Sequence, residues 1–189
     1  MLNYIESRCI SLVIARQFCQ EVDFVLLNKK QTAIGFQNDS GGYELRSCDF
    51  KGSSSPKSPR FIDDGSPVIS VFEGFFDFLS FKTINKELEE PFTNSLILNS
   101  LSFFEKKKDL MEKHKTVHLF LDRDHAGRTQ TTKALRWNKS IYLDNSHIYK
   151  ERSDLNDWLM SNHQKFNLSK ANIYKPVYKQ IKIKRHGGI

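Results

Sequence analysis

The chain has 189 residues and a formal net charge of +7, which leaves room for one ordinary domain plus a smaller one and suits a polyanionic partner or a solvated basic surface. Its three cysteines lack a Cys-x-x-Cys spacing, which argues against zinc and disulfide frameworks and predicts reduced thiols. No apolar stretch approaches the ~20 residues that cross a bilayer and no signal-peptide pattern opens the chain, so we expect a cytoplasmic protein.

Residues 1–66 are predicted to form a small α+β subdomain. The apolar spacing that follows Ser11 predicts a helix, with Ser11 as its cap. Three short alternating runs then predict strands at residues 22–27, 32–37 and 43–48. Small turn residues, Asn-Asp-Ser-Gly-Gly, separate the last two runs, so we expect these two strands to form an antiparallel hairpin.

The end of this subdomain, residues 49–66, contains the densest Gly, Ser and Pro of the chain and few apolar side chains. We therefore expect a mobile basic loop at the domain boundary. One interpretation is a loop that binds phosphate through Lys51, Lys57 and Arg60, and an equal alternative is a plain linker.

From residue 67 to 165 short apolar runs alternate with helical patterns, which predicts an α/β fold: a mostly parallel sheet with helices on both faces. The predicted strands are residues 68–72, 96–98, 117–121 and 141–143. The predicted helices are residues 75–88, 102–114, 126–137 and 154–163, the last with Ser153 as its cap. The remaining segment, residues 166–189, alternates Lys with apolar residues and is either an edge strand or a disordered basic tail.

Two of the predicted strands end abruptly at carboxylates. Glu73 and Gly74 follow the first of them, and Asp122 and Asp124 follow the third. The carboxyl ends of parallel strands share one edge of the sheet, where open α/β sheets place their sites. Carboxylates gathered there would repel one another unless a hard divalent cation lay among them, and oxygen ligands suit Mg²⁺ or Mn²⁺. The sequence therefore predicts a metal site at this edge.

Other interpretations of these acidic residues explain less. A calcium-binding EF-hand loop that begins at Asp122 would need an oxygen ligand at its fifth place and Glu at its twelfth, but Ala126 and Lys133 stand there. A capping role for Asp124 accounts for one carboxylate and leaves Asp122 without a purpose. Glu73 alone would be weak evidence, because a solvated strand end is an equal alternative.

Together the two motifs resemble the Toprim domain shared by bacterial primases, topoisomerases and certain nucleases. A Glu-Gly strand end, here Glu73-Gly74, is followed after one α/β unit by the pattern Asp122-x-Asp124-x-x-Gly127. The resemblance covers residues 66 to 160, and the second motif is the more specific. Within this superfamily the chain is most similar to the catalytic core of bacterial primases.

The primase resemblance extends to the N-terminal subdomain and to a later acidic motif. Tyr4-x-x-x-Arg8-x-Ile10, residues 33–38 and residues 42–46 are similar to the small α+β subdomain that precedes Toprim in primases. The segment 153–157, Ser-Asp-Leu-Asn-Asp, resembles the later motif. Asn156 departs from it, because this position is often acidic and an amide oxygen is a poorer ligand for a hard cation.

The resemblance implies a role for each matching residue. Glu73 would be the acid/base or metal-organising carboxylate, with Asp122 and Asp124 as metal ligands. Asp77 and Asp154 would be supporting carboxylates, although helix-start electrostatics is an equal alternative for Asp154. The basic residues expected along the template or the triphosphate are Arg8, Arg46, Lys51, Lys57 and Arg60.

The resemblance also implies a function: metal-dependent nucleotidyl transfer that makes an RNA primer on single-stranded DNA from nucleoside triphosphates, with a helicase or other replication or mobilisation proteins as partners. Two alternatives stay open. One is a Toprim nuclease, in which the same carboxylates activate water against a phosphodiester. The other is a non-catalytic nucleic-acid-binding remnant of a primase, since neither a zinc-binding nor a helicase-contacting domain is visible. A short chain of this sort suits a mobile element.

Overall fold

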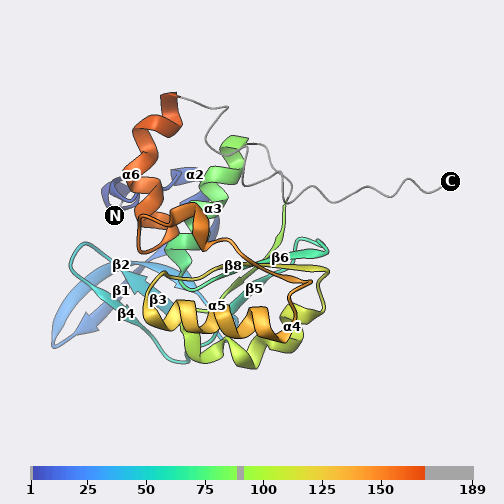
Figure 1. Cartoon of the computed structure of the whole chain (residues 1–189). Helices are drawn as coiled ribbons and strands as arrows, with labels where there is room; N and C mark the ends of the chain where they lie inside the picture. The colour runs from blue at the N-terminus through green and yellow to red at the C-terminus, as the bar shows by residue number, and fades with distance from the viewer. Residues whose placement is uncertain (1, 89–91, 169–189) are drawn as a thin grey trace.

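The computed structural model describes residues 2–88 and 92–168, which fold around two β-sheets (Figure 1). The first sheet is antiparallel, and the second is mostly parallel with helices on both faces, which confirms the predicted fold class. No helix in these two ranges has the length and apolar character to span a membrane. The predicted basic tail lies outside the described residues from residue 169 onward.

The N-terminal part contains two short helices and the four-stranded antiparallel sheet. The helices are α1 (Leu2–Ser7), which was not predicted, and α2 (Leu12–Phe18). In order across the sheet, the strands are β1 (Cys19–Leu26), β2 (Lys29–Gln37), β3 (Tyr43–Arg46) and β4 (Lys51–Ser53). The predicted hairpin is confirmed, because β2 and β3 pair up to Gln37 and Tyr43. Asn38 holds its turn by accepting backbone hydrogen bonds from Ser40 (2.9 Å) and Gly42 (3.0 Å).

The second sheet carries the acidic strand ends. In order across the sheet, its strands are β5 (Arg60–Ile62), β7 (Asn94–Ile97), β6 (Val68–Phe72), β8 (Thr116–Phe120) and β9 (Tyr142–Asp144). β5 runs antiparallel to β7, and the other pairs are parallel. One face is covered by α3 (Phe75–Leu88) and α6 (Leu155–Leu168), and the other by α4 (Lys108–Glu112) and α5 (His125–Trp137) (Figure 1).

Residues 49–66 are more ordered than the predicted loop. The segment begins with β4 in the first sheet and ends with β5 in the second, so it connects the two sheets. Phe61 of β5 packs against the core on the α4 and α5 face, and the Arg60 guanidinium lies over the Phe36 ring at 5.8 Å. These long-range contacts order a segment whose Gly, Ser and Pro content predicts mobility.

Residues 102–114, predicted as one helix, are divided into three short pieces. The 3₁₀ turns η1 (Leu101–Phe103) and η2 (Glu105–Lys107) precede α4. The Ser100 hydroxyl accepts a hydrogen bond from the Ser102 backbone (3.3 Å) and so begins the first turn. Phe104 and Met111 are fully buried, and three lysines lie between them in the sequence. Short turns in place of one regular helix allow both apolar side chains to reach the core.

One predicted helix cap is confirmed in position only, and the other is wrong. Ser11 is the N-cap residue of α2, but its side chain makes no capping hydrogen bond, and its backbone N–H donates to Thr83 Oγ1 (3.1 Å). At the start of α6 the cap is Asp154, whose Oδ1 accepts from the Asp157 backbone (2.7 Å). Ser153 donates its hydroxyl to Asp157 instead.

The hydrophobic core has two parts, one on each face of the second sheet. The part under α3 and α6 also includes side chains of α1, α2 and the first sheet. Phe36 of β2 stacks on Phe75 of α3, with ring centroids 5.2 Å apart. The other part lies between the sheet and α4 and α5. The first sheet therefore packs against the beginning of α3, beside the carboxyl ends of β6 and β8.

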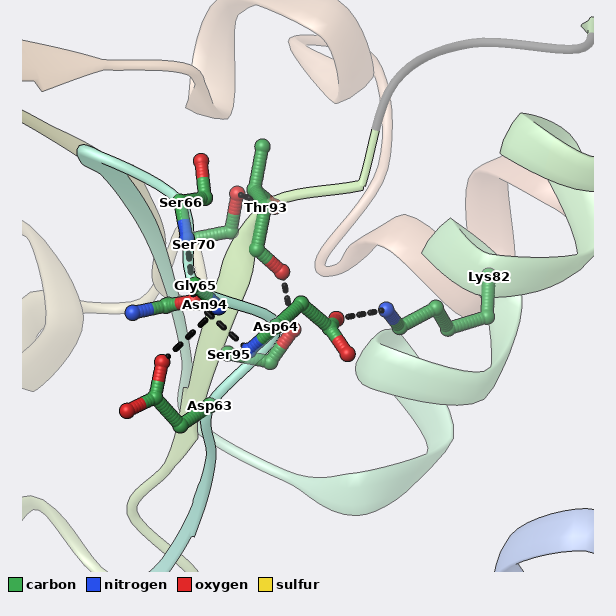
Figure 2. Close-up of polar contacts among 9 residues, drawn as sticks. All are labelled: Asp63, Asp64, Gly65, Ser66, Ser70, Lys82, Thr93, Asn94 and Ser95. Carbon is green, nitrogen blue, oxygen red and sulfur yellow. Dashed lines mark hydrogen bonds and ion pairs between the residues drawn. The ribbon is translucent and has the colours of Figure 1, made fainter.

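A polar network occupies the opposite edge of the second sheet, where β6 and β7 begin (Figure 2). Asn94 Oδ1 accepts hydrogen bonds from the backbone of Asp64 (2.8 Å) and Ser66 (3.0 Å). Lys82 of α3 pairs with the Asp64 carboxylate at 3.2 Å. These groups partner one another and hold the connection from β5 to β6, so their role is structural.

Candidate active site

The predicted acidic strand ends meet in space. Glu73 directly follows β6, Asp122 follows β8, and these two strands are parallel neighbours paired up to Phe72 and Phe120. The Asp122 backbone N–H donates to Glu73 Oε2 at 3.3 Å. The sheet register therefore brings together carboxylates that are 49 residues apart in the sequence.

Asp124 lies at the start of the helix that follows β8. Its Oδ1 accepts a hydrogen bond from the Gly127 backbone at 2.8 Å, so Asp124 is the N-cap of α5. A Cβ atom at Gly127 would overlap the Asp122 carbonyl oxygen, which explains the glycine of the motif. The capping interpretation of Asp124 is thus seen directly, and its role as a metal ligand stays a prediction.

Asp77 and Asp154 reach the same place from two other helices. Asp77 lies in the first turn of α3 and is 7% exposed, and its Oδ1 accepts from the Asn156 backbone at 3.2 Å. Asp154 begins α6, as described above. The helices α3, α5 and α6 therefore all begin beside Glu73 and Asp122.

Asn156 connects this acidic cluster to the N-terminal part. It is 1% exposed, and its side-chain Nδ2 donates to the Arg8 carbonyl (3.0 Å) and to Ser80 Oγ (2.9 Å). These two bonds fix the orientation of the amide, so Oδ1 is the atom left over. The sequence indicated Asn156 only as an imperfect metal ligand and gave no sign of its contact with Arg8.

A cavity of about 800 Å³ lies between the acidic cluster and the N-terminal part. One wall carries Glu73, Asp77, Asp122 and Asp154, all of them predicted site residues. The rest of the lining, from the N-terminal part, carries four of the five predicted basic residues, namely Arg8, Arg46, Lys51 and Lys57, together with the acidic Glu44 and Asp49. Arg60 lies elsewhere, over Phe36, with Nη1 donating to the Gln37 carbonyl at 2.9 Å.

Aromatic rings hold the two arginines of the basic wall. The Arg8 guanidinium lies over Phe76 at 5.4 Å and that of Arg46 over Phe75 at 5.6 Å, and both rings belong to the first turn of α3. Burial lowers the pKa of Arg46 below its ordinary value, although neighbouring Glu44 opposes this effect. The guanidinium groups are therefore positioned before any ligand arrives.

Four buried polar atoms of residues that line the cavity have no hydrogen-bond partner in the part of the chain that the structure describes. They are Arg8 Nε, Glu44 Oε1, Asn99 Oδ1 and Asn156 Oδ1. Buried polar groups without partners are uncommon, and each is costly unless a ligand or water satisfies it. Their concentration around one cavity indicates a site for a polar ligand.

Asn99 is a cavity residue that the sequence analysis missed. It follows β7 as Glu73 follows β6, and its backbone has a φ of 60°, a left-handed conformation that non-glycine residues seldom adopt. Its Nδ2 donates to the Ser58 carbonyl at 3.1 Å, which fixes the amide. Its position after a third predicted strand was the available signal, but an amide after a strand indicates a metal site less strongly than a carboxylate does.

Burial, and after it the crowding of carboxylates, controls the electrostatics of the acidic wall. Burial, followed by the negative charges of Glu73, Asp154 and Asp124, raises the pKa of Asp122 to about 7. Burial also raises the pKa of Glu73, although its hydrogen bond from Asp122 opposes this effect. The pKa of Asp77 lies well above its ordinary value, again because of burial and then of Asp154 and Asp122. A bound cation would relieve this repulsion.

The donor chemistry of this wall fits Mg²⁺. In the described ranges, no three His, Cys, Asp or Glu side chains lie close enough together to enclose a metal on their own. Mg²⁺ does not need such an enclosure, because proteins commonly hold it with one or two carboxylates together with waters and substrate phosphates. Glu73 and Asp122, which are adjacent and line the same cavity as the basic residues, are the pair best placed for this, and Asn156 Oδ1 is a further unpartnered oxygen.

Comparisons with known proteins agree with this geometry. Residues 70–159 match the family model described as Toprim-like, and residues 1–55 match a domain of unknown function (DUF8464). The chain is similar to the crystal structure of the primase fragment of the bacteriophage T7 primase-helicase protein, with a TM-score of 0.61 and 16% identity over 88% of this chain and 72% of that one.

A second solved structure contains primase domains bound to an RNA/DNA hybrid and dTTP, in a complex with the bacteriophage T7 lagging-strand DNA polymerase. Its TM-score is 0.59 with 17% identity, covering 87% of this chain and 88% of that one. No curated protein matches the sequence. Residues 70–159 therefore form a Toprim-like domain, and the fold of the chain is similar to that of these primase structures.

Proposed function

We propose that this protein is a primase-type nucleotidyltransferase that joins nucleoside triphosphates into a primer on single-stranded DNA. The observation that carries the proposal is one cavity lined both by the carboxylates Glu73, Asp77, Asp122 and Asp154 and by the cations Arg8, Arg46, Lys51 and Lys57. A nucleoside triphosphate and its divalent cation need these two kinds of wall. The primase-like fold and the Toprim-like domain support the same reaction class.

Each wall has a separate task in this reaction. Glu73 and Asp122 would hold Mg²⁺, with Asp77 and Asp154 as supporting charges. When bound, the ion would help to deprotonate the attacking hydroxyl and offset charge on the triphosphate. Arg8 and Arg46, held against aromatic rings, would bind phosphate oxygens through guanidinium hydrogen bonds. Lys51 and Lys57 would add charge at the mouth of the cavity.

The proposal is tested by incubating the protein with single-stranded DNA, labelled ribonucleotides and Mg²⁺, and by separating the products by length. Wild type should make short RNA products, and Asp122→Asn should lower their yield about 100-fold or more, because the cation loses a principal ligand. Asp109→Asn, which removes an exposed carboxylate of α4, is the matched control and should leave the yield unchanged.

The same gel separates the competing functions. Shortened DNA in place of new RNA would replace the proposal with phosphodiester hydrolysis by the same carboxylates. If wild type changes neither the DNA nor the nucleotides, the chain is a nucleic-acid-binding protein and the proposal is wrong. Participation of a helicase or polymerase, origin in a mobile element and a cytoplasmic location stay predictions from the sequence.

A further inference from the structure

The outer face of α5 is basic and is not used by the candidate active site. The helix carries Arg128, Lys133 and Arg136 and has no Asp or Glu along its length. It covers the face of the second sheet opposite to α3 and α6 (Figure 1). These three side chains, with His125, Thr129 and Thr132, border a shallow hollow of about 590 Å³.

Two of the three cations on this face are available to a ligand. In the described part of the chain, the side chains of Arg128 and Arg136 have no hydrogen bond or ion pair, and both residues are exposed. Lys133 pairs with Glu105 at 2.6 Å, but both side chains are largely exposed, so the pair is readily exchanged. The hollow itself is bordered by no carboxylate.

The basic surface continues toward the active site. Arg128 also borders a second hollow, of about 520 Å³, which Arg123, Lys150 and Arg152 share. Three carboxylates border this hollow too: Asp124 caps α5, Asp157 accepts from Ser153, and the exposed Glu151 lies 4.0 Å from Lys150. The two hollows therefore form one basic surface that begins where α5 begins, next to Asp122.

The spacing and chemistry of this surface fit a phosphate backbone. Arg128 and Arg136 are eight residues apart, or about 12 Å along the helix axis, which is the span of roughly three to four phosphates in one strand of a duplex. Among the described residues, the exposed His125 imidazole is the one ring that borders the hollow, because Trp137 at the end of α5 is covered by Phe104 at 5.6 Å and by the Lys108 ammonium at 5.1 Å. Binding to single strands relies on the stacking of bases on aromatic rings, whereas a duplex keeps its bases inside and presents phosphates.

We propose that the outer face of α5 binds the phosphate backbone of a nucleic-acid duplex, the template paired with its new primer, beside the active site. This inference rests on the proposed function, because only primer synthesis supplies that duplex. Arg128 and Arg136 make the principal phosphate contacts, Arg152 extends them toward the site, and Thr132 adds a hydroxyl donor.

The inference is tested by fluorescence anisotropy with a labelled RNA–DNA hybrid, in EDTA and without nucleotides so that no reaction occurs. Arg128→Glu/Arg136→Glu should weaken hybrid binding at least tenfold. It should also reduce the steepness of the plot of log K against log[salt] by about 2, because two phosphate contacts are lost. Lys29→Glu/Lys30→Glu, on β2 of the first sheet, changes the net charge equally and should keep nearly all of the affinity. Both variants change exposed residues, and an unaltered melting temperature will confirm that they fold.

Two results would overturn the inference: equal losses in both double variants, or wild-type protein that binds the DNA strand alone more tightly than the hybrid. The primer assay keeps the two proposals apart. If wild type makes no primer but the α5 variant loses hybrid binding, the proposed function is wrong and the duplex-binding surface stands. If wild type makes primers and the α5 variant binds the hybrid normally, the surface is wrong and the function stands.

Discussion

At the scale of single residues, Asn156 couples the two walls of the cavity. Its amide holds the Arg8 carbonyl and Ser80, and its backbone N–H holds the Asp77 carboxylate. Arg8 and Asp77 both line the cavity, so one buried residue links the basic part of its lining to the acidic part.

Replacing this amide should destabilise the protein. Asn156→Ala leaves the Arg8 carbonyl and the buried Ser80 hydroxyl without this donor, and we expect a loss of about 1–3 kcal/mol in the free energy of unfolding, measured with urea. The matched control is Asn162→Ala, also in α6, whose amide bonds only to the Trp158 carbonyl one turn earlier. Equal losses in the two variants would contradict a special role for Asn156.

Asp122 makes stability depend on pH. An aspartate carboxyl has an ordinary pKa of 3.8, and in the folded protein the pKa of Asp122 is raised to about 7, so between these values the folded protein holds a proton that the unfolded chain has released. The unfolded state thus binds fewer protons, and stability falls as pH rises through this window.

Without divalent cations, wild-type protein should therefore lose stability between pH 5 and pH 7, by up to ~1.4 kcal/mol per pH unit from this group. Asp122→Asn removes the titration and should flatten the dependence, as urea unfolding at several pH values in EDTA would show. Equally steep curves for the two proteins would contradict the raised pKa of Asp122.

The sequence predicted the carboxylates of the site better than its other residues. The sequence indicated Glu73 and Asp122 because each carboxylate follows an apolar strand. Parallel strands end at one edge of the sheet, where sites of open α/β sheets lie. Asn99 and Glu44 were missed, because their burial and their missing partners depend on contacts between distant segments. Arg60 was misplaced, since composition cannot tell an arginine over a ring from one that faces a cavity.

At the scale of elements, the motif glycines differ in what surrounds them. A Cβ at Gly127 would overlap the Asp122 backbone, whereas a Cβ at Gly74 would meet only Asp77 Oδ2, at an ordinary 3.5 Å. The start of α5 is thus packed directly on the backbone of the residue that we expect to hold the cation.

Gly127→Ala should therefore displace α5 from β8, cost about 1–3 kcal/mol in the free energy of unfolding and lower primer synthesis. Gly74→Ala should unfold within about 1 kcal/mol of wild type, because its new methyl group has room. Urea unfolding of both variants makes the comparison. If Gly127→Ala is as stable as Gly74→Ala, close packing does not explain the glycine.

Elements with a strong local pattern were predicted closely, and those fixed by distant contacts were not. The strand β6 and the helix α3 lie where the sequence predicted them, because an unbroken apolar run and a long helical pattern need no outside information. The strands β4 and β5 have three residues each and pair with segments of two different sheets. So short a strand carries no periodicity of its own.

At the scale of the whole molecule, the two sheets share one core. Phe36 of the first sheet is fully buried against Phe75 and Phe78 of α3, in the same cluster as residues of α6. The N-terminal part and the Toprim-like domain therefore stabilise each other, and the cavity depends on their contact.

Phe36→Ala should cost about 3–5 kcal/mol and lower the unfolding midpoint of the entire protein in one transition. Both tryptophans, Trp137 and Trp158, belong to the second part, so their fluorescence reports on a region that does not contain the substitution. Phe24→Ala, on the half-buried β1 side chain that meets Phe50, should cost less than half as much. An unchanged tryptophan midpoint in Phe36→Ala would show that the parts unfold separately.

Because α3 and α6 begin at the cavity and α5 begins just after Asp122, the peptide dipoles of these helices add partial positive charge there, equivalent to about half an elementary charge at each N-terminus. This fixed field partly compensates the neighbouring anionic side chains and, unlike a bound cation, cannot be removed by a chelator. The apoprotein should thus keep its cavity assembled between turnovers and receive each incoming nucleotide together with the ion that the nucleotide carries.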